Sequence, residues 1–253
     1  MKIINPSTAH IPVLRELWKE AFGDSDIFLD NFFSVAFHTK RCRIAINNGE
    51  IAAALYWFDC SFSEEPMAYL YAVATAKKYR GQGICHTLMK DTHNHLAGHG
   101  YQGALLVPGG KELFLFYESL RYKTCCYVNT ISCLAAKTGA PLRQITKKEY
   151  ATLRRSYLPV GSVIQENESI DFLETQAQLY VGNGFLLAAR SEGNLLRGIE
   201  LLGTTNHVAE ITAALGCSRG LFRTPGEAVP FAMYYPLQDN RSFSPTYFGL
   251  AFD

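Results

Sequence analysis

The stretch that decides the fold runs from residue 71 to residue 89 and reads Tyr71-Ala72-Val73-Ala74-Thr75-Ala76-Lys77-Lys78-Tyr79-Arg80-Gly81-Gln82-Gly83-Ile84-Cys85-His86-Thr87-Leu88-Met89. A β-rich run ends at Thr75, and the turn Arg80–Gly83 opens a helix. The first turn of a helix presents backbone N–H groups without internal acceptors, and the helix dipole adds partial positive charge there. Glycines in the turn let a pyrophosphate approach the main chain, and Arg80 adds a charge-assisted hydrogen bond. The stretch therefore predicts an anion-binding turn.

Other phosphate-binding motifs do not fit this turn. No Gly-Lys-Ser/Thr follows at the spacing of a P-loop, and no Gly-x-Gly-x-x-Gly fingerprint is present. The preceding strand offers an edge to which an extended ligand with amide groups could hydrogen-bond. The alternative is that the turn only connects a strand to a helix.

The full run resembles the pattern of the GCN5-related N-acetyltransferase (GNAT) superfamily, in which a strand ending Val-Ala-Thr precedes an Arg-x-x-Gly-x-Gly/Ala turn. Here Cys85 stands where the pattern has a small Gly or Ala, which implies a tighter fit. The resemblance implies an α/β (α+β) fold with a mixed, mostly antiparallel sheet flanked by helices, and acetyl-CoA as cosubstrate. The residues that it assigns to acetyl-CoA are Val73, Ala74, Thr75, Arg80, Gly81, Gln82, Gly83, Ile84 and Cys85.

A second segment agrees with this resemblance. Gly103–Val107 reads as the next strand, which in that family splays away from the previous one. The segment Leu113–Tyr122 then resembles the family's helix carrying Phe-Tyr-Glu, although Arg121-Tyr122 replaces the usual Gly-Phe. By this resemblance Tyr117 is the general acid that protonates the departing CoA thiolate, which suits a phenol with an ordinary pKa near 10. The alternative role for Tyr117 is packing as a half-buried aromatic side chain.

The N-terminal part alternates strands and helices in an α/β layout. Apolar spacing predicts two helices, and Asn-Gly is the strongest two-residue hairpin signal. The expected elements are a strand at Lys2–Ile4, helices at Ile11–Phe22 and Ile27–Phe37, a hairpin of Arg43–Ile46 and Ile51–Phe58 around Asn48-Gly49, and a strand at Met67–Thr75.

The C-terminal half reads as a degenerate repeat of the first. Residues 27–51 align without gaps with residues 171–195, so that Gly49 of the first hairpin meets Gly193. Lys137–Pro141 is then the linker. We predict a GNAT catalytic domain at 1–137 and a degenerate GNAT-like domain at 138–253, which packs or shapes a substrate cleft and holds no second cofactor.

The general base is not identified by the sequence. Glu64, Glu65 and Glu118 read as surface carboxylates. In tandem-domain acetyltransferases of the enhanced-intracellular-survival type, which this chain resembles, the C-terminal carboxylate enters the active site. The apolar run Tyr247–Asp253 is therefore expected to dock, and it either brings the carboxylate of Asp253 to the site or completes a sheet.

Histidine and cysteine positions favour no other chemistry. His86, His93, His95 and His99 follow the turn, and the last two have a metal-compatible spacing, but neither an HExxH motif nor an acidic triad accompanies them. We therefore interpret these histidines as part of a solvated helix face and expect no metal site. The seven cysteines form no CxxC pair and read as reduced thiols, and Cys85 reads as part of the turn rather than as a nucleophile.

The composition of the chain limits the classes of partner that we expect. The chain has 24 basic and 23 acidic residues, 48% apolar residues, no apolar stretch of membrane-spanning length and no secretory signal. We therefore expect a cytoplasmic protein that binds neither nucleic acid nor membrane, with homodimerisation left open. The expected function is transfer of an acetyl group from acetyl-CoA to a primary amine of a small molecule or peptide. The alternative is a non-catalytic acyl-CoA-binding regulatory protein, and an aminoacyl-tRNA-dependent peptidyltransferase is disfavoured.

Overall fold

The computed structural model describes residues 1–238 and 244–252. The chain forms two compact units. Unit 1 contains Met1–Lys123 and a later segment that starts at Met233, and unit 2 contains Thr124–Ala232 and a later segment that starts at Ser244. These ranges differ from the predicted 1–137 and 138–253 in two places, because residues 124–137 belong to unit 2 and a segment that starts at Met233 belongs to unit 1.

Unit 1 is built on a six-stranded sheet in the order β1-β2-β3-β4-β5-β13. The pairing is antiparallel except between β4 and β5, which are parallel. Its strands are β1 (Lys2–Ile4), β2 (Cys42–Asn47), β3 (Glu50–Phe62), β4 (Glu65–Thr75), β5 (Gly103–Leu106) and the second half of β13 (Val229–Pro236). Its helices are α1 (Ile11–Phe22), α2 (Asp26–Asn31), α3 (Ile84–Gly98) and α4 (Lys111–Ser119). The prediction of a mixed, mostly antiparallel sheet flanked by helices is confirmed.

The local predictions for the N-terminal part are confirmed with one refinement. The predicted second helix divides into α2 and a π-helical turn at Phe32–Ala36. In the hairpin, Asn47 pairs with Glu50, and Asn48 and Gly49 have φ values of 52° and 82°. Two consecutive positive φ values define the type I′ turn that Asn-Gly favours.

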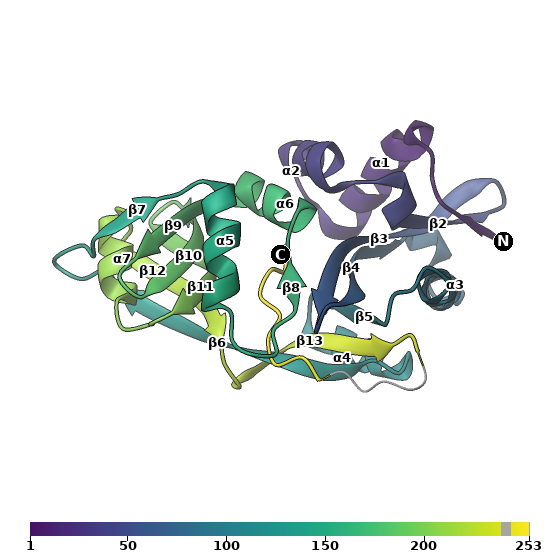
Figure 1. The fold of residues 1–253 in the computed structure, drawn as a ribbon. Coiled ribbons are helices and arrows are strands. Elements are labelled where there is room, and N and C mark those ends of the chain that lie inside the picture. Colours follow the sequence, from purple (N-terminus) through teal and green to yellow (C-terminus); the bar gives the residue numbers. More distant parts are fainter. Residues whose placement is uncertain (239–243, 253) are drawn as a thin grey trace. The chain divides into compact units, whose positions relative to one another are not determined.

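The sheet of unit 1 carries helices on both faces (Figure 1). On one face Trp18 of α1 contacts Tyr56 and Tyr71, with ring centroids 5.1 and 5.6 Å apart. On the other face α3 and α4 cover the main core, which includes Leu55, Leu70, Leu88, Met89 and Tyr117. Because helices cover both faces of the sheet, the side chains on both faces of its strands are buried. This explains why the strand residues are apolar at nearly every position.

In unit 2 the strand order is β6-β12-β11-β10-β9-β7. The strands are β6 (Lys123–Leu134), β7 (Leu142–Gln144), β9 (Gln178–Gly182), β10 (Phe185–Glu192), β11 (Leu195–Gly203) and β12 (Arg219–Pro225). Its helices are α5 (Lys147–Tyr157), α6 (Glu168–Gln176) and α7 (Val208–Ala214), and a short strand β8 covers Ile164–Gln165. Ile211 of α7 packs in a core on one face with Leu201, and α5 meets Glu200 on the other.

The two units have the same order of helices and strands, but the residues that correspond are not those that the sequence alignment predicted. In each unit a strand, two helices and three antiparallel strands precede a helix and a parallel strand. By this order the β2–β3 turn at Asn48-Gly49 corresponds to the β9–β10 turn at Asn183-Gly184, not to Gly193. The ungapped alignment of 27–51 with 171–195 was therefore wrong, because it paired the first hairpin of one unit with the second hairpin of the other.

The C-terminal segment is docked on unit 2, as its apolar sequence predicted. Tyr247, Phe248, Leu250 and Phe252 are buried, and the Gln165 side chain hydrogen-bonds both the N–H and the C=O of Leu250. The predicted carboxylate of Asp253 lies outside the described residues. Within the part of the chain that the structure describes, no helix combines the length and apolar character needed to cross a membrane.

Candidate functional site

The predicted anion-binding turn lies where β4 passes into α3. β4 ends at Thr75, a 3-10 turn covers Lys77–Tyr79, and α3 begins at Ile84. The N–H of Thr87 donates to the carbonyl of Gly83 at 3.1 Å and so closes the first turn of α3. The N–H groups of the residues before Thr87 in that turn have no acceptor within the helix, which makes them donors for an anion.

Both glycines of the turn are required by the backbone. Gly81 and Gly83 have φ values of 74° and 72°, in the left-handed region that other residues rarely adopt. A Cβ added at either position would meet no atom within 4 Å. The glycines therefore set the backbone conformation and leave the surface above the turn open, as a bound pyrophosphate would need.

Two side chains brace the turn from within. Arg80 Nε donates to the Thr75 carbonyl at 3.1 Å, and Gln82 Nε2 donates to the Lys78 carbonyl at 3.1 Å. The Arg80 bond holds its guanidinium beside the end of β4, where its other N–H groups remain separate donors. The sequence predicted Arg80 as a ligand group and did not anticipate that it also fixes the loop.

β4 is distorted close to the turn. Ala54 pairs with Ala74 but Tyr56 pairs with Tyr71, so β4 carries one extra residue opposite β3, and Ala72 has a φ of 47°. A non-glycine residue in this conformation marks a β-bulge that re-aims the backbone after it. The parallel pairing with β5 covers only Met67–Tyr69. The last part of β4, including Val73, Ala74 and Thr75, therefore extends beyond its pairing with β5, which agrees with the predicted splay.

Cys85 and Tyr117 approach each other below the turn. Cys85 packs against the core from the first turn of α3, and Tyr117 of α4 is 8% exposed within that core. Burial, followed by the nearby Cys85, raises the pKa of the Tyr117 phenol, so the hydroxyl keeps its proton at neutral pH. Tyr117 thus belongs to the same core as Cys85 of the predicted turn, in a more buried position than a half-exposed tyrosine would have.

The Cys85 thiol should be slow to alkylate. Burial raises its pKa to about 11. A thiol with that pKa is only about 0.1% thiolate at pH 8, and the thiolate is the reactive form. We expect iodoacetamide labelling of Cys85, followed by peptide mass spectrometry, to accelerate about tenfold per pH unit from pH 8 to 10. Labelling as fast as that of free glutathione at pH 8 would contradict the buried position.

The interpretation of the four α3 histidines as a solvated face was wrong for His93. His93 is 8% exposed, its Nε2 is 2.7 Å from the Tyr122 hydroxyl, and its ring stacks on Tyr235 of β13 at 4.2 Å. His86 and His99 are exposed, and His95 is intermediate. Among the described residues no group of three or more His, Cys, Asp or Glu side chains is arranged to hold a metal ion.

The buried His93 should make stability depend on pH. Burial lowers its pKa from 6.5 to about 4. Between these values the unfolded chain binds a proton that the folded chain does not, so stability is full above pH 6.5 and falls as pH drops towards 4, by up to about 3 kcal/mol. Denaturant unfolding should show this slope, His93→Gln should flatten it, and the exposed-site control His99→Gln should retain it. A slope unchanged in His93→Gln would refute the assignment.

Other sequence-derived candidates lie at the surface. Glu64 and Glu118 are exposed, as expected, and Glu65 is intermediate. None of these carboxylates has the burial that would tune it as a base. The exposure of these three carboxylates therefore does not support any of them as the general base. Tyr122 adjoins Tyr117 and also contacts His93 and Tyr235. The contact with Tyr235 could not be predicted from the sequence, because it depends on β13 pairing with β5.

Comparison with known proteins shows which fold this architecture resembles. The model of the acetyltransferase (GNAT) domain family matches residues 2–125. A GCN5-related N-acetyltransferase from Anabaena variabilis superposes with a TM-score of 0.71 over 94% of this chain and 73% of its own, at 15% identity. A putative acetyltransferase from Pyrococcus horikoshii gives 0.67 over 99% of this chain and 94% of its own, at 13% identity. No curated protein matches the sequence significantly. The fold is that of GNAT acetyltransferases, with an acetyltransferase domain match over the first half of the chain.

Proposed function

We propose that the chain is an acyl-CoA-dependent N-acetyltransferase that acetylates a primary amine of a small molecule or peptide. The observation that carries the proposal is the combination of three features in unit 1. An open glycine turn begins α3, the bulged end of β4 extends beyond its pairing with β5, and the protonated Tyr117 phenol packs close to Cys85.

The turn and strand divide the binding of acetyl-CoA between them. The backbone N–H groups of the turn Arg80–Cys85, including Gly81, Gln82, Gly83 and Ile84, would hold the pyrophosphate, and Arg80 would add charge. Val73, Ala74 and Thr75 would hydrogen-bond the pantetheine amides along the strand edge. These assignments rest on the resemblance and on the geometry of the turn, and they define which substitutions should weaken binding.

Direct attack accounts for transfer with the residues at hand. The neutral amine nitrogen attacks the thioester carbonyl carbon and gives up one N–H proton to a base or to water as the carbon–nitrogen bond forms, and the carbon–sulfur bond then breaks. The Tyr117 phenol donates its proton to the departing thiolate and is reprotonated from solvent. Backbone N–H groups near Val73 or Thr75 would polarise the carbonyl, and the rigid strand supplies positioning.

The second candidate function is a non-catalytic acyl-CoA sensor. The burial of Tyr117 within the core supports this candidate, because a phenol that only packs would look the same in the structure. The test is amine-dependent release of free thiol from acetyl-CoA, measured across a library of small amines and amine-terminated peptides. Release with any acceptor above the rate without acceptor supports the enzyme, whereas saturable acetyl-CoA binding without release for every acceptor supports the sensor.

Unit 2 is proposed as the degenerate GNAT-like domain predicted for residues 138–253, with the ranges adjusted to the structural unit. Two observations support this beyond the shared element order. Ala188 pairs with Glu200 and Ala189 with Gly198, so β11 carries an extra residue opposite β10, just as β4 does opposite β3. The segment directly after β11, Thr204-Thr205-Asn206-His207, does not form an Arg-Gly-Gln-Gly turn. The unit would thus keep the strand distortion and lack the phosphate-binding turn.

The remaining expectations concern partners and location. The near-balanced charge of 24 basic and 23 acidic residues still argues against nucleic acid as a partner. The proposal is an enzyme of the cytoplasm that uses acetyl-CoA without a metal, with a small-molecule or peptide amine as acceptor. Homodimerisation stays open.

A further inference from the structure

The indole N–H of Trp57 is a buried donor in unit 1 that lacks an acceptor among the described residues. Trp57 lies on β3 and is 4% exposed. It interacts with the Tyr101 hydroxyl, but not at hydrogen-bond distance. The other tryptophan of the chain behaves differently, since Trp18 Nε1 donates to Asp24 Oδ2 at 2.7 Å. Buried polar groups are nearly always hydrogen-bonded, so the unpaired N–H indicates a place where a ligand acceptor binds.

Trp57 lines a pocket of about 650 Å³ whose walls are rich in aromatic rings. Tyr101, His95 and His99 line the same pocket. The rings of His95 and His99 lie 4.2 Å apart, and the Trp57 ring lies 6.0 Å from that of His95. Burial, followed by the nearby Arg43, lowers the pKa of His95, so this ring is uncharged at neutral pH. The walls therefore suit a flat aromatic ring.

The polar groups of the pocket favour a ligand that brings an acceptor. His38 Nδ1 accepts from the Lys40 N–H at 3.2 Å, so His38 carries its ring proton on Nε2 and donates from there. Lys40 is exposed and adds an ammonium group to the lining. The carboxylate of Asp59 also lines the pocket, but it already accepts from the Tyr101 hydroxyl at 2.5 Å and from Arg41 Nη1 at 3.1 Å.

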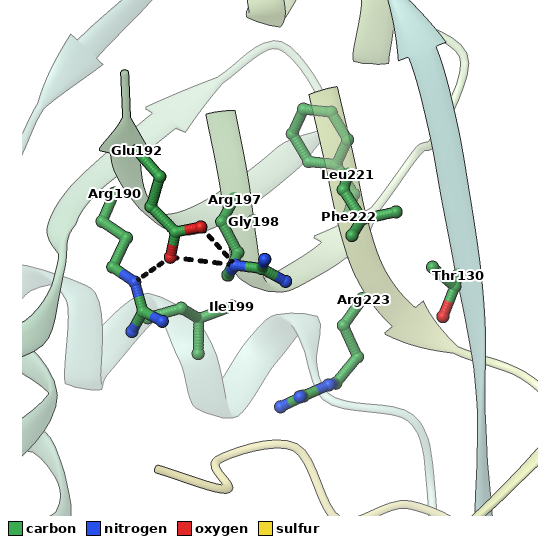
Figure 2. A pocket seen from close by; sticks show the side chains of 9 residues that line it. All are labelled: Thr130, Arg190, Glu192, Arg197, Gly198, Ile199, Leu221, Phe222 and Arg223. Atoms are coloured by element: carbon green, nitrogen blue, oxygen red, sulfur yellow. Dashed lines mark hydrogen bonds and ion pairs between the residues drawn. The ribbon is translucent and has the colours of Figure 1, made fainter. Parts of the chain in front are cut away.

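A charged pocket of unit 2 differs from this one. Figure 2 shows that Glu192 joins two of its arginines, accepting from Arg190 Nε at 2.8 Å and from Arg197 Nε at 3.0 Å. These charges are compensated within the protein, so they do not point to a ligand. The Trp57 N–H, by contrast, has no partner in the part of the chain that the structure describes.

The pocket of unit 1 lies away from the proposed acetyl-CoA turn. α3 begins beside that turn at Ile84, whereas His95 lies in the last turn of the helix. From Ile84 to His95 the helix axis is about 16 Å long. On the sheet, Asp59 pairs with Ala68, towards the opposite end of β4 from Thr75. The pocket is therefore separate from the residues to which the transfer reaction is assigned.

We propose that this pocket binds a small aromatic carboxylate. The ring of the ligand packs against the aromatic walls, and one oxygen of its carboxylate accepts from the Trp57 N–H. A carboxylate is favoured over a neutral acceptor, because charge-assisted hydrogen bonds are the stronger ones. His38 Nε2 and the Lys40 ammonium add donors from the loop before β2. The ligand binds without turnover, so a failure of this proposal would leave the proposed transferase function untouched.

The probe is benzoate, titrated calorimetrically into the full chain. We expect saturable binding with a Kd below about 5 mM. Trp57→Phe keeps an aromatic ring and removes the N–H, and it should weaken binding about tenfold. The matched control is Trp18→Phe, which removes an indole N–H that is bonded to Asp24 outside the pocket, and it should stay within about twofold of the wild type. Lys40→Gln should weaken binding about threefold.

Fluorescence tests the site without altering Trp57. In Trp18→Phe the only tryptophan left is Trp57, so saturating benzoate should change its emission with the calorimetric Kd. Benzyl alcohol, which has the ring but no carboxylate, should bind at least about tenfold more weakly. Thermal unfolding checks that each variant keeps its fold.

Three results would overturn the proposal. The first is the absence of saturable benzoate binding to the wild type, or an unchanged Trp57 emission at saturation. The second is equal weakening in Trp57→Phe and Trp18→Phe. The third is a response of the Trp57 emission to benzylamine at lower concentration than to benzoate, which would assign the pocket to aromatic amines.

Discussion

Replacing Arg154 by methionine is expected to lower the free energy of unfolding of unit 2 by about 3–5 kcal/mol. Arg154 is 2% exposed, and it donates through Nε and Nη2 to the two oxygens of Glu200 at 2.7 and 2.9 Å. Glu200 is fully buried and also accepts from the hydroxyls of Tyr150 and Tyr247 at 2.9 and 3.1 Å. Methionine would leave that carboxylate buried without its counter-charge, and the cost of an unpaired buried charge dominates the change.

The neighbouring residue provides the control for this prediction. Arg155 follows on the same helix and pairs with Glu166, but its side chain is 67% exposed. Arg155→Met should cost less than about 1 kcal/mol, because exposed ion pairs contribute little. The double variant Arg154→Met with Glu200→Leu should recover most of the loss, since no charge remains buried. Urea unfolding that places Arg154→Met within the range of Arg155→Met would contradict this description of the network.

Replacing Tyr117 by phenylalanine is expected to lower kcat about 10²–10³-fold while leaving acetyl-CoA affinity and stability nearly unchanged. Phenylalanine keeps the ring contacts with Phe116 and Tyr122, whose centroids lie 5.1 and 5.8 Å away, and removes only the hydroxyl. Since burial holds the pKa of that hydroxyl above its usual range, the hydroxyl is protonated at neutral pH, and the role proposed for it is to donate a proton rather than to accept one. Steady-state kinetics with the best acceptor from the amine library measure the effect.

Tyr122→Phe is the matched control for the catalytic role. Tyr122 adjoins Tyr117 in the same core, but its hydroxyl is bonded to His93 Nε2 at 2.7 Å. Its removal should cost stability, by leaving His93 without that partner, and should change kcat only a few-fold. If Tyr117→Phe and Tyr122→Phe reduced kcat equally, Tyr117 would be a packing residue and the acid would have to be sought elsewhere.

The parts of the fold that the sequence predicted well are those governed by local chemistry. The Asn48-Gly49 turn follows from the need for positive φ, and the boundaries of α1 from its apolar period and from Gly23 at its end, whose φ is 77°. The turn from strand to helix at Thr75–Cys85 could likewise be predicted from the sequence, because its glycines are required by the backbone of the turn itself.

Non-local pairing explains what the sequence did not show. β13 joins β5 in unit 1 although more than a hundred residues separate them, and no local signal marks such a pairing. The burial of His93 under Tyr235 depends on this strand, so a surface interpretation of the α3 histidines was the natural error. The proposed repeat was aligned in the wrong register, because similar hairpins follow one another in unit 2 and the alignment was displaced by one hairpin.

In the candidate site, too, the features set by local sequence could be predicted and those set by non-local contacts could not. The turn, the bulged strand end and Tyr117 could be proposed because each lies within a short, recognisable segment. The bracing role of Arg80 and the buried neighbours of Tyr117 required coordinates.

The central claim, that the Thr75–Cys85 turn binds acetyl-CoA, is tested most directly by calorimetric titration of acetyl-CoA into the wild type, Gly83→Arg and Gly23→Arg. Gly23 also has a positive φ with open space around it, at 77° beside the 72° of Gly83, so both variants bear the same backbone strain. We predict saturable binding to the wild type and to Gly23→Arg, and at least a hundredfold loss, about 2.7 kcal/mol, in Gly83→Arg. No binding to the wild type, or equal binding to all three proteins, would contradict the claim.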